Sequence, residues 1–158
     1  MDRNIYLANR LREVLLDGTW IANTNYKHQL EQIGWKQATE KVGELNSIAA
    51  LTFHIRYYLD GLLNVLRGGA LEIRDKYSYD LAPIATEEEW RDLVTSFLSS
   101  AEAFVQAVSE IPDNQLNMPF IDEKYGSYLR NIEGVIEHSY YHLGQISLIR
   151  KLNSEKLK

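Results

Sequence analysis

The longest regular pattern of apolar residues lies between Gly43 and the glycine pair at Gly68 and Gly69. Leucine and isoleucine recur there at intervals of three and four residues, at Leu45, Ile48, Leu51, Ile55, Leu59, Leu62 and Leu66. This period places the apolar side chains on one face of an amphipathic helix, and paired glycines favour its end. We therefore predict a helix between Gly43 and Gly68, with its apolar face in the core.

Two other stretches show the same period. One ends at Gly18 and carries Leu7, Leu11, Val14 and Leu15. The other begins at Thr86, which forms a capping-box pattern with Glu89, and it continues to Pro112. Its apolar residues are Trp90, Leu93, Val94, Phe97, Leu98, Ala101, Phe104 and Val108. Each stretch is predicted to form one helix.

A fourth periodic stretch follows Gly126. Its apolar residues are Leu129, Ile132, Val135, Ile136, Leu143, Ile146 and Ile149. Arg150 and Lys151 then form a basic turn, which suits the negative end of a helix dipole. We predict a fourth helix that ends at this turn.

The connections between these stretches are long and irregular. Thr24 could cap a short helix through Leu30, which Gly34 would end. Residues 70–85 show no sustained period and are predicted to form an ordered surface crossing. Because there is no alternating strand pattern and no repeat, we predict an all-α chain, with one four-helix-bundle domain over residues 1–158.

Composition and charge narrow the possible partners. The net charge of −5 and the scattered lysines and arginines argue against a nucleic-acid partner. Charges interrupt the N-terminal apolar pattern and no apolar run reaches membrane length, so we expect a cytoplasmic protein with neither a signal peptide nor a membrane partner. Since the chain has no cysteine, its chemistry must rest on histidine, carboxylates and serine.

Two histidines in the fourth predicted helix have the spacing of a metal-binding pair. His138 and His142 are four residues apart, so they lie about 40° apart on one helix face. Their direction is shared by the apolar residues Val135, Ile146 and Ile149. His54 lies on the corresponding inner face of the second predicted helix. Three inward-facing imidazoles could therefore converge on one point.

A single inward histidine is usually a core residue satisfied by one hydrogen bond, so neither helix alone indicates a metal site. Three buried neutral imidazoles each need a partner, and one shared ion supplies all three. We therefore predict that His54, His138 and His142 bind a divalent metal with an open coordination position, with Zn or Ni favoured over Fe, Co or Mn. His28 has no partner at ligand spacing and is predicted to lie on the surface.

Four further residues are candidates for the surroundings of this site. Gln145 lies one turn beyond His142 and could orient a ligand or a bound water, although an interhelical hydrogen bond is the commoner role. Tyr58, Tyr141 and Trp20 could line a pocket, although such residues more often serve in packing. The sequence offers no nucleophile-elbow serine, phosphate loop or di-iron carboxylate pattern, so no catalytic residue is assigned.

These motifs resemble those of the DinB-like superfamily, also called the DinB/YfiT group. The resemblance rests on LNSIAALTFHIRYYLDGLL around His54 and on NIEGVIEHSYYHLGQISLIRK around His138 and His142. Its most specific part is the segment from His142 to Ile146. The resemblance implies an up-down-down-up four-helix bundle, commonly a homodimer, with one metal ligand from the second helix and two from the fourth.

The resemblance also implies a class of chemistry. Characterised members include metal-dependent transferases that use low-molecular-weight thiols such as bacillithiol or mycothiol, and a mycothiol-dependent isomerase. The chain is therefore expected to be a metal-dependent enzyme acting on a small molecule, either a thiol S-transferase or a hydrolase. Two alternatives stay open: a non-catalytic metal- or ligand-binding bundle, and a structural bundle with a vestigial histidine site. An open coordination position that faces a pocket would favour the enzyme.

Overall fold

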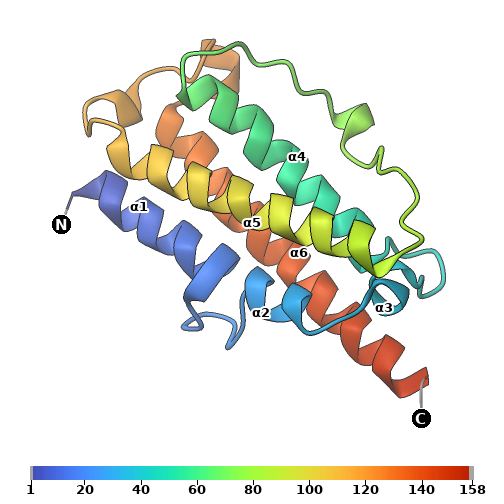
Figure 1. Cartoon of the computed structure of the whole chain (residues 1–158). Helices are drawn as coiled ribbons and strands as arrows, with labels where there is room; N and C mark the ends of the chain where they lie inside the picture. The colour runs from blue at the N-terminus through green and yellow to red at the C-terminus, as the bar shows by residue number, and fades with distance from the viewer. Residues whose placement is uncertain (1, 157–158) are drawn as a thin grey trace.

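The computed structural model describes residues 2–156, and its regular structure is helical (Figure 1). The long helices are α1 (Arg3–Arg12), α4 (Ile48–Leu66), α5 (Glu87–Glu110) and α6 (Tyr128–Lys156). The described residues contain no strand, only one isolated bridge between Pro119 and Ser127. The prediction of an all-α chain is confirmed. Within the described part of the chain, none of the helices combines the length and the apolar character that crossing a membrane requires.

The long helices pack along one another. α5 lies against α1 and α4, and α6 lies against the same two helices. In Figure 1, α1 and α6 run in one direction, whereas α4 and α5 run in the opposite direction. Because α4 and α5 run in the same direction, the segment that connects them must run back along the length of the helices. Residues 67–86, here called the crossing segment, make this return and contain one short turn, η2 (Asp75–Tyr77).

Capping residues explain where the helices begin. The hydroxyl of Thr86 accepts a hydrogen bond from the backbone of Glu89 at 3.2 Å, and the Glu89 carboxylate accepts one from the backbone of Thr86 at 3.0 Å. The predicted capping box is thus present at the start of α5. α4 begins at Ile48, because the hydroxyl of Ser47 caps its first turn. Leu45 therefore lies outside the helix and is 47% exposed, contrary to the prediction.

The connection between α1 and α4 contains more helix than the sequence predicts. Asn25, not Thr24, caps the first short helix by accepting a hydrogen bond from the backbone of His28 at 2.8 Å. The hydroxyl of Thr24 lies 2.9 Å from Nδ1 of His28 instead. The elements of this connection are the π-helical turn η1 (Glu13–Asp17), α2 (Tyr26–Glu31) and α3 (Trp35–Thr39). The sequence pattern does not predict α3, because five residues are too few to show a helical period.

α6 is also longer than predicted, since it continues past Arg150 and Lys151 to Lys156. Asn153 is buried beyond the basic turn, and its side-chain nitrogen donates to the carbonyls of Gln37 and Glu40 at 3.3 and 3.4 Å. These bonds give the added turns a polar anchor on the α3 region. The connection from α5 to α6 contains two short turns, η3 (Gln115–Asn117) and η4 (Glu123–Tyr125).

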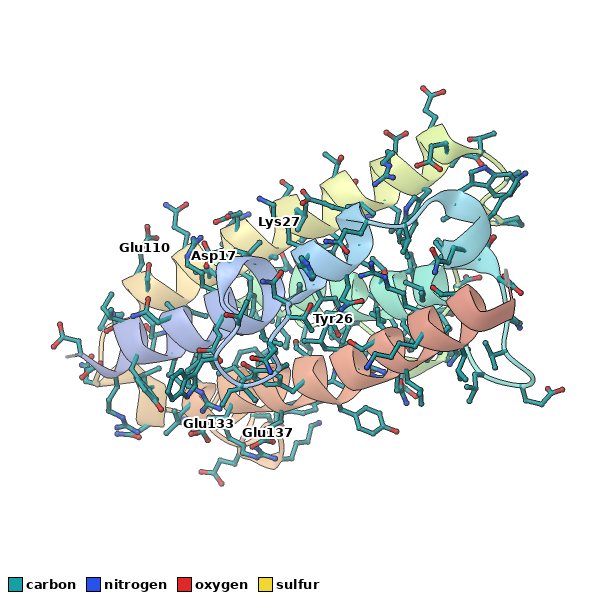
Figure 2. The ribbon with its side chains drawn as sticks, turned by 90° about the horizontal axis from the view of Figure 1, so that it is seen from below. Asp17, Tyr26, Lys27, Glu110, Glu133 and Glu137 are labelled. Atoms are coloured by element: carbon teal, nitrogen blue, oxygen red, sulfur yellow. The ribbon has the colours of Figure 1, made fainter. Side chains whose placement is uncertain are left out.

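Charged side chains cover the outside of the helices, while an aromatic residue of α2 reaches inside. Figure 2 shows outward-pointing charged side chains, among them Asp17, Lys27, Glu110 and Glu137. Tyr26, by contrast, lies between the helices and is fully buried. Its ring stacks on Phe97 at 5.2 Å, and its hydroxyl donates to the carbonyl of Ser139 at 2.9 Å. α2 therefore joins α5 to α6 through one residue.

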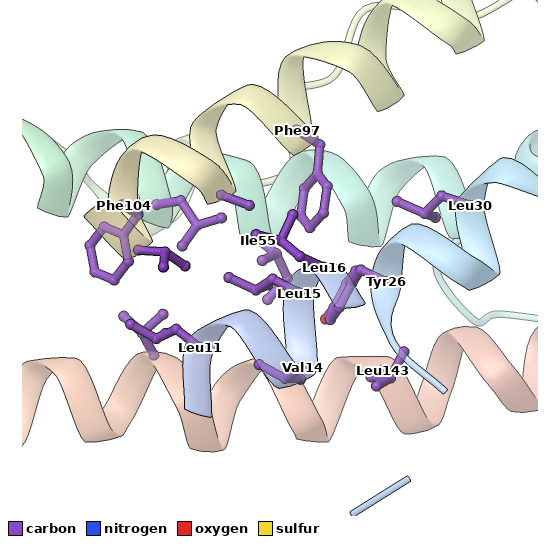
Figure 3. Packing of buried hydrophobic residues seen from close by; sticks show 14 of the residues in the cluster. Leu11, Val14, Leu15, Leu16, Tyr26, Leu30, Ile55, Phe97, Phe104 and Leu143 are labelled. Atoms are coloured by element: carbon purple, nitrogen blue, oxygen red, sulfur yellow. The ribbon is translucent and has the colours of Figure 1, made fainter. Parts of the chain in front are cut away.

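The core lies between the four long helices (Figure 3). Ile55 and Leu59 of α4 are buried as predicted, and Phe97 and Phe104 enter the same cluster from α5. Leu62 differs from the prediction, because it is only partly buried and packs at the edge of the cluster. The reason is a groove beside α4, to which Leu62 contributes a wall.

Candidate metal centre

Three histidine rings converge between α4 and α6. The Nε2 atom of His138 lies 3.1 Å from Nε2 of His54 and 2.9 Å from Nε2 of His142. The ligand atoms of the three rings all lie within 4.8 Å of one another. The structure thus brings together the three histidines that the sequence singles out. In both of these close pairs, the atoms that face each other are the Nε2 atoms of the rings.

Helix packing explains this convergence. His138 and His142 are one turn apart on α6, and α6 lies against α4, which carries His54. His54 and His142 are each 5% exposed, and His138 is half-buried. Their neighbours Ile55 and Ile146 belong to the hydrophobic core, so turning either helix away would expose apolar surface. The packing of α4 on α6 therefore brings the three rings together.

Gln145 sets the orientation of one ring. Its side-chain oxygen lies 2.6 Å from Nδ1 of His142. Because an amide oxygen can only accept, Nδ1 must carry the proton, which leaves the lone pair on Nε2. This contact is the one through which Gln145 could orient His142 as a ligand. Nδ1 of His54 is buried and has no hydrogen-bond partner of good geometry in the described structure, although the backbone of Ser78 acts to raise the pKa of that ring.

Burial favours the neutral form of all three rings. Desolvation lowers the pKa of His54, and repulsion from His142 lowers it further. Desolvation, then repulsion from His142 and His54, lowers the pKa of His138 from 6.5 to about 4. Desolvation also lowers the pKa of His142, against the opposing effect of the hydrogen bond that His142 donates to Gln145. Neutral imidazoles offer the lone pairs that metal binding requires.

The crossing segment forms one wall around the rings. The ring of Tyr79 stacks on His54 with centroids 4.1 Å apart, and Tyr58 presents its ring to both His54 and His138 at 5.1 and 5.4 Å. The hydroxyl of Tyr58 donates to the carboxylate of Asp75 at 2.6 Å. Burial first, and Asp75 second, raise the pKa of Tyr58 to about 12. The sequence pattern does not indicate Asp75 or Tyr79, because the crossing segment has no period. A cluster of aromatic residues is the signal in that segment that could have pointed to them.

Two contacts fix the crossing segment on α4. The hydroxyl of Tyr57 accepts from the backbone nitrogen of Arg74 at 2.8 Å and donates to its carbonyl at 3.0 Å. One turn further along, a Cβ atom on Gly61 would lie 2.1 Å from the Ile73 side chain. Only glycine at this position lets the segment approach so closely. The wall beside the histidines is therefore held by α4 itself.

The other aromatic candidates lie differently. Tyr141 contacts His142 with ring centroids 4.9 Å apart, but it is 65% exposed and flanks the site from outside. Trp20 is 87% exposed in the turn after η1, and it makes none of the described ring contacts with the three histidines. Its predicted place in a pocket is therefore not found. His28 is exposed, as predicted.

A groove of about 500 Å³ opens beside His138, between α4, the crossing segment and the first half of α6. We call it the His138 groove. Tyr58 and His138 form the end next to the histidines. Its walls are mainly apolar, with Leu62, Leu71, Ile73 and Val135. Its volume is in the usual range of small-molecule sites, which span roughly 300–1,000 Å³.

The donor set consists of nitrogen atoms alone. Among the described residues, no carboxylate belongs to the histidine cluster. Glu137 precedes His138 but is exposed and pairs with Arg130 at 3.0 Å. Three protein ligands and an adjoining concave space are the arrangement of a catalytic metal site, in which another position is left for substrate or water. A closed structural site would require a fourth protein ligand.

Comparison with families of known proteins gives a match. The sequence model of the DinB superfamily matches residues 23–146, a range that includes His54, His138, His142 and Gln145. No curated protein and no solved structure matches the chain. The matched range leaves out α1 and the exposed Trp20.

Proposed function

Because this chain belongs to the DinB superfamily, we propose that it is a divalent-metal-dependent enzyme whose ion is held by Nε2 of His54, His138 and His142. The convergence of these nitrogens is the observation that carries the proposal. Three nitrogens held at about 2.0–2.1 Å from one ion, at right or tetrahedral angles, lie roughly 2.8–3.4 Å apart. Two of the three observed separations, 2.9 and 3.1 Å, lie within this range, and all three ligand atoms lie within 4.8 Å of one another.

The donor set supports Zn or Ni, because imidazole nitrogen suits these ions. Fe, Co and Mn are further candidates, with Mn the least favoured because it prefers oxygen ligands. Bound there, the ion would act as a Lewis acid that lowers the pKa of a coordinated thiol or water at neutral pH. Such chemistry fits a transferase that uses a low-molecular-weight thiol, or a hydrolase. The His138 groove supports an enzyme over a purely structural bundle, since it leaves room for a small molecule beside His138.

The residues around the rings have positioning roles in this proposal. Gln145 keeps the lone pair of His142 on Nε2, and Tyr79 covers one face of His54. Tyr58 keeps its proton at neutral pH and shares it with Asp75, so its hydroxyl oxygen has a fixed direction at the groove end. None of these residues is assigned as a general acid or base.

The proposal extends to the architecture and to the setting of the protein. The pairwise packing and directions of α1, α4, α5 and α6 support an up-down-down-up four-helix bundle. We propose a cytoplasmic homodimer that acts on a small molecule, with neither nucleic acid nor membrane as a partner. The negative net charge supports the absence of a nucleic-acid partner. Light scattering during gel filtration will measure the oligomeric state.

The first prediction tests the metal site directly. Untagged protein should bind one Zn²⁺ or Ni²⁺ per chain in calorimetric titration, and the metal should raise its melting temperature. His142→Ala leaves two ligands and should abolish both effects. The metal should add about 2.7 kcal/mol to the free energy of unfolding at a hundredfold excess over Kd. His28→Ala is the matched control, because it removes an exposed histidine and should bind metal like the wild type.

Three results would contradict the proposal. Equal metal binding by the His142→Ala and His28→Ala variants would place the ion elsewhere. Failure of the wild-type chain to bind any of the five ions would leave a structural bundle with a vestigial site. A chain that binds metal but shows neither thiol transfer nor hydrolysis across a panel of small electrophiles and esters would favour the non-catalytic binding protein.

A further inference from the structure

Resting on this proposed function, we propose that the His138 groove binds the body of the substrate, and that this substrate is a small molecule with an apolar body and an anionic group. The apolar body would lie against the walls of the groove, with the reacting group at the His138 end. The anionic group would meet Arg130 at the other end. Neither the sequence motifs nor the family match assigns Arg130 or the groove.

The walls of the groove fit an apolar body. α4 contributes Leu62, the crossing segment contributes Leu71 and Ile73, and α6 contributes Val135. Leu62 keeps part of its surface exposed there, although its register on α4 is that of a core residue. Apolar surface in a concave site of this volume is what small organic ligands cover when they bind.

Gly134 lies in the same wall, one turn before His138 on α6. Glycine is unfavourable inside a helix, so its presence calls for a neighbour that needs the space. Gly61 has such a neighbour in Ile73, but a Cβ on Gly134 would meet nothing within 4 Å. The space above Gly134 thus belongs to the groove, and a ligand that reaches His138 would pass over it.

Gly144, the other glycine inside α6, has the same free space but lies outside the groove. A Cβ there would also meet nothing within 4 Å, yet Gly144 is exposed and does not line the groove. The place of Gly134 in the wall, and not its lack of a side chain alone, therefore supports the proposal. The two glycines form a matched pair for experiments, since both lie inside α6.

Arg130 supplies the charge. It lines the groove eight residues before His138, a distance of about 12 Å along the helix axis. Its ion pair with Glu137 joins two side chains that are 62% and 63% exposed, and exposed pairs of this kind are weak. A carboxylate or sulfonate at the groove end can therefore compete for the guanidinium. Asp75 lies beside Tyr58 at the histidine end, so an anion is favoured at the Arg130 end.

Two fluorescent probes of the same shape test the proposal on metal-free protein. Anilinonaphthalene sulfonate carries the anion, and N-phenylnaphthylamine is its neutral counterpart. We expect saturable binding of both at one site per chain. Gly134→Leu should weaken the binding of both at least about tenfold by filling the groove, whereas Gly144→Leu should bind both like the wild type. Circular dichroism checks the fold, and the pair Gly134→Ala and Gly144→Ala gives the same comparison with a smaller side chain.

Charge is tested separately. Arg130→Gln should weaken the sulfonate probe several-fold and leave the neutral probe unchanged, and Glu137→Gln should strengthen the sulfonate probe by freeing Arg130. Unchanged binding in the Gly134 variants would overturn the groove as the site. Equal loss of both probes in Arg130→Gln would overturn the anionic group. Because the probes are tested on metal-free protein, the two proposals can fail separately. Probe binding by a chain that binds no metal would contradict only the proposed function. Metal binding by a chain that binds no probe would contradict only this inference.

Discussion

At the scale of single residues, the hydrogen bond from His142 to Gln145 decides how well the site is prepared for an ion. A free imidazole exchanges its proton between the two ring nitrogens. The side-chain oxygen of Gln145, 2.6 Å from Nδ1, fixes the proton on the side away from the cluster. Metal-binding histidines commonly have such a partner, which orients the ring and raises its basicity.

Replacing this partner should therefore change metal affinity without changing the ligands. Gln145→Leu should weaken Zn²⁺ binding by about 10–100-fold, because His142 loses its acceptor. Gln145→Glu keeps an acceptor at the same place and should bind Zn²⁺ at least as tightly as the wild type. Competition calorimetry against a chelator will measure both. Gln106→Leu on the exposed side of α5 is the control, and an equal loss there would refute a specific role for Gln145.

At the scale of elements, the crossing segment decides the shape of the site. It brings Tyr79 onto His54, gives Tyr58 its partner Asp75, and supplies one wall of the His138 groove. Its close seat on α4 depends on Gly61, where a Cβ would collide with Ile73. The loop is therefore part of the site as much as the helices are.

Gly61→Ala tests this seat. The added methyl should push Ile73 away and lower the free energy of unfolding by about 1–3 kcal/mol, although alanine is the better helix former. Adding Ile73→Ala removes the colliding atoms, so the double variant should lose less than the sum of the two single variants. Urea unfolding of the four proteins gives the coupling. Additive losses would show that the crossing segment does not rest on Gly61.

The elements also show how far the sequence could be interpreted. The long helices and the three histidines follow from apolar spacing, because a helix that buries one face must repeat that face every 3.6 residues. Asp75, Tyr79 and Arg130 could not be found in this way. The first two lie in a segment without a period, and the third lines the His138 groove, which exists because Gly134 and the loop leave space beside α6. Leu62 was expected in the core because its spacing is that of a core residue, and the spacing does not reveal the groove that leaves it partly exposed.

At the scale of the whole molecule, the burial of His54 and His142 and the partial burial of His138 make the stability of the metal-free chain depend on pH. Their pKa values are lowered in the folded chain, to about 4 for His138, so the unfolded chain binds more protons between that value and 6.5. The neutral rings therefore impose no penalty on the folded chain above about pH 6.5. As the pH falls toward about 4, the unfolded chain takes up protons that the folded chain does not, and the free energy of unfolding decreases.

Metal-free protein should therefore unfold at lower urea concentration at about pH 5.5 than at about pH 7.5, a range in which most carboxylates stay ionised. His138→Gln removes one of the rings and should reduce this difference, whereas His28→Ala should leave it as in the wild type. Urea midpoints measured at the two pH values decide the matter. A His138→Gln variant with the full wild-type pH dependence would show that the buried rings are not its cause.

The helices that carry the candidate metal ligands lie far apart in the sequence, and this separation bears on the lifetime of the folded chain. His54 and His138 are 84 residues apart, so their helices meet only after a long stretch of chain has been closed. Contacts of this range tend to form late in folding, after the local helices. An ion that needs both helices would therefore stabilise the native state far more than the folding transition state. The ion would slow unfolding and leave the folding rate nearly unchanged, so it would increase the kinetic stability of the folded chain.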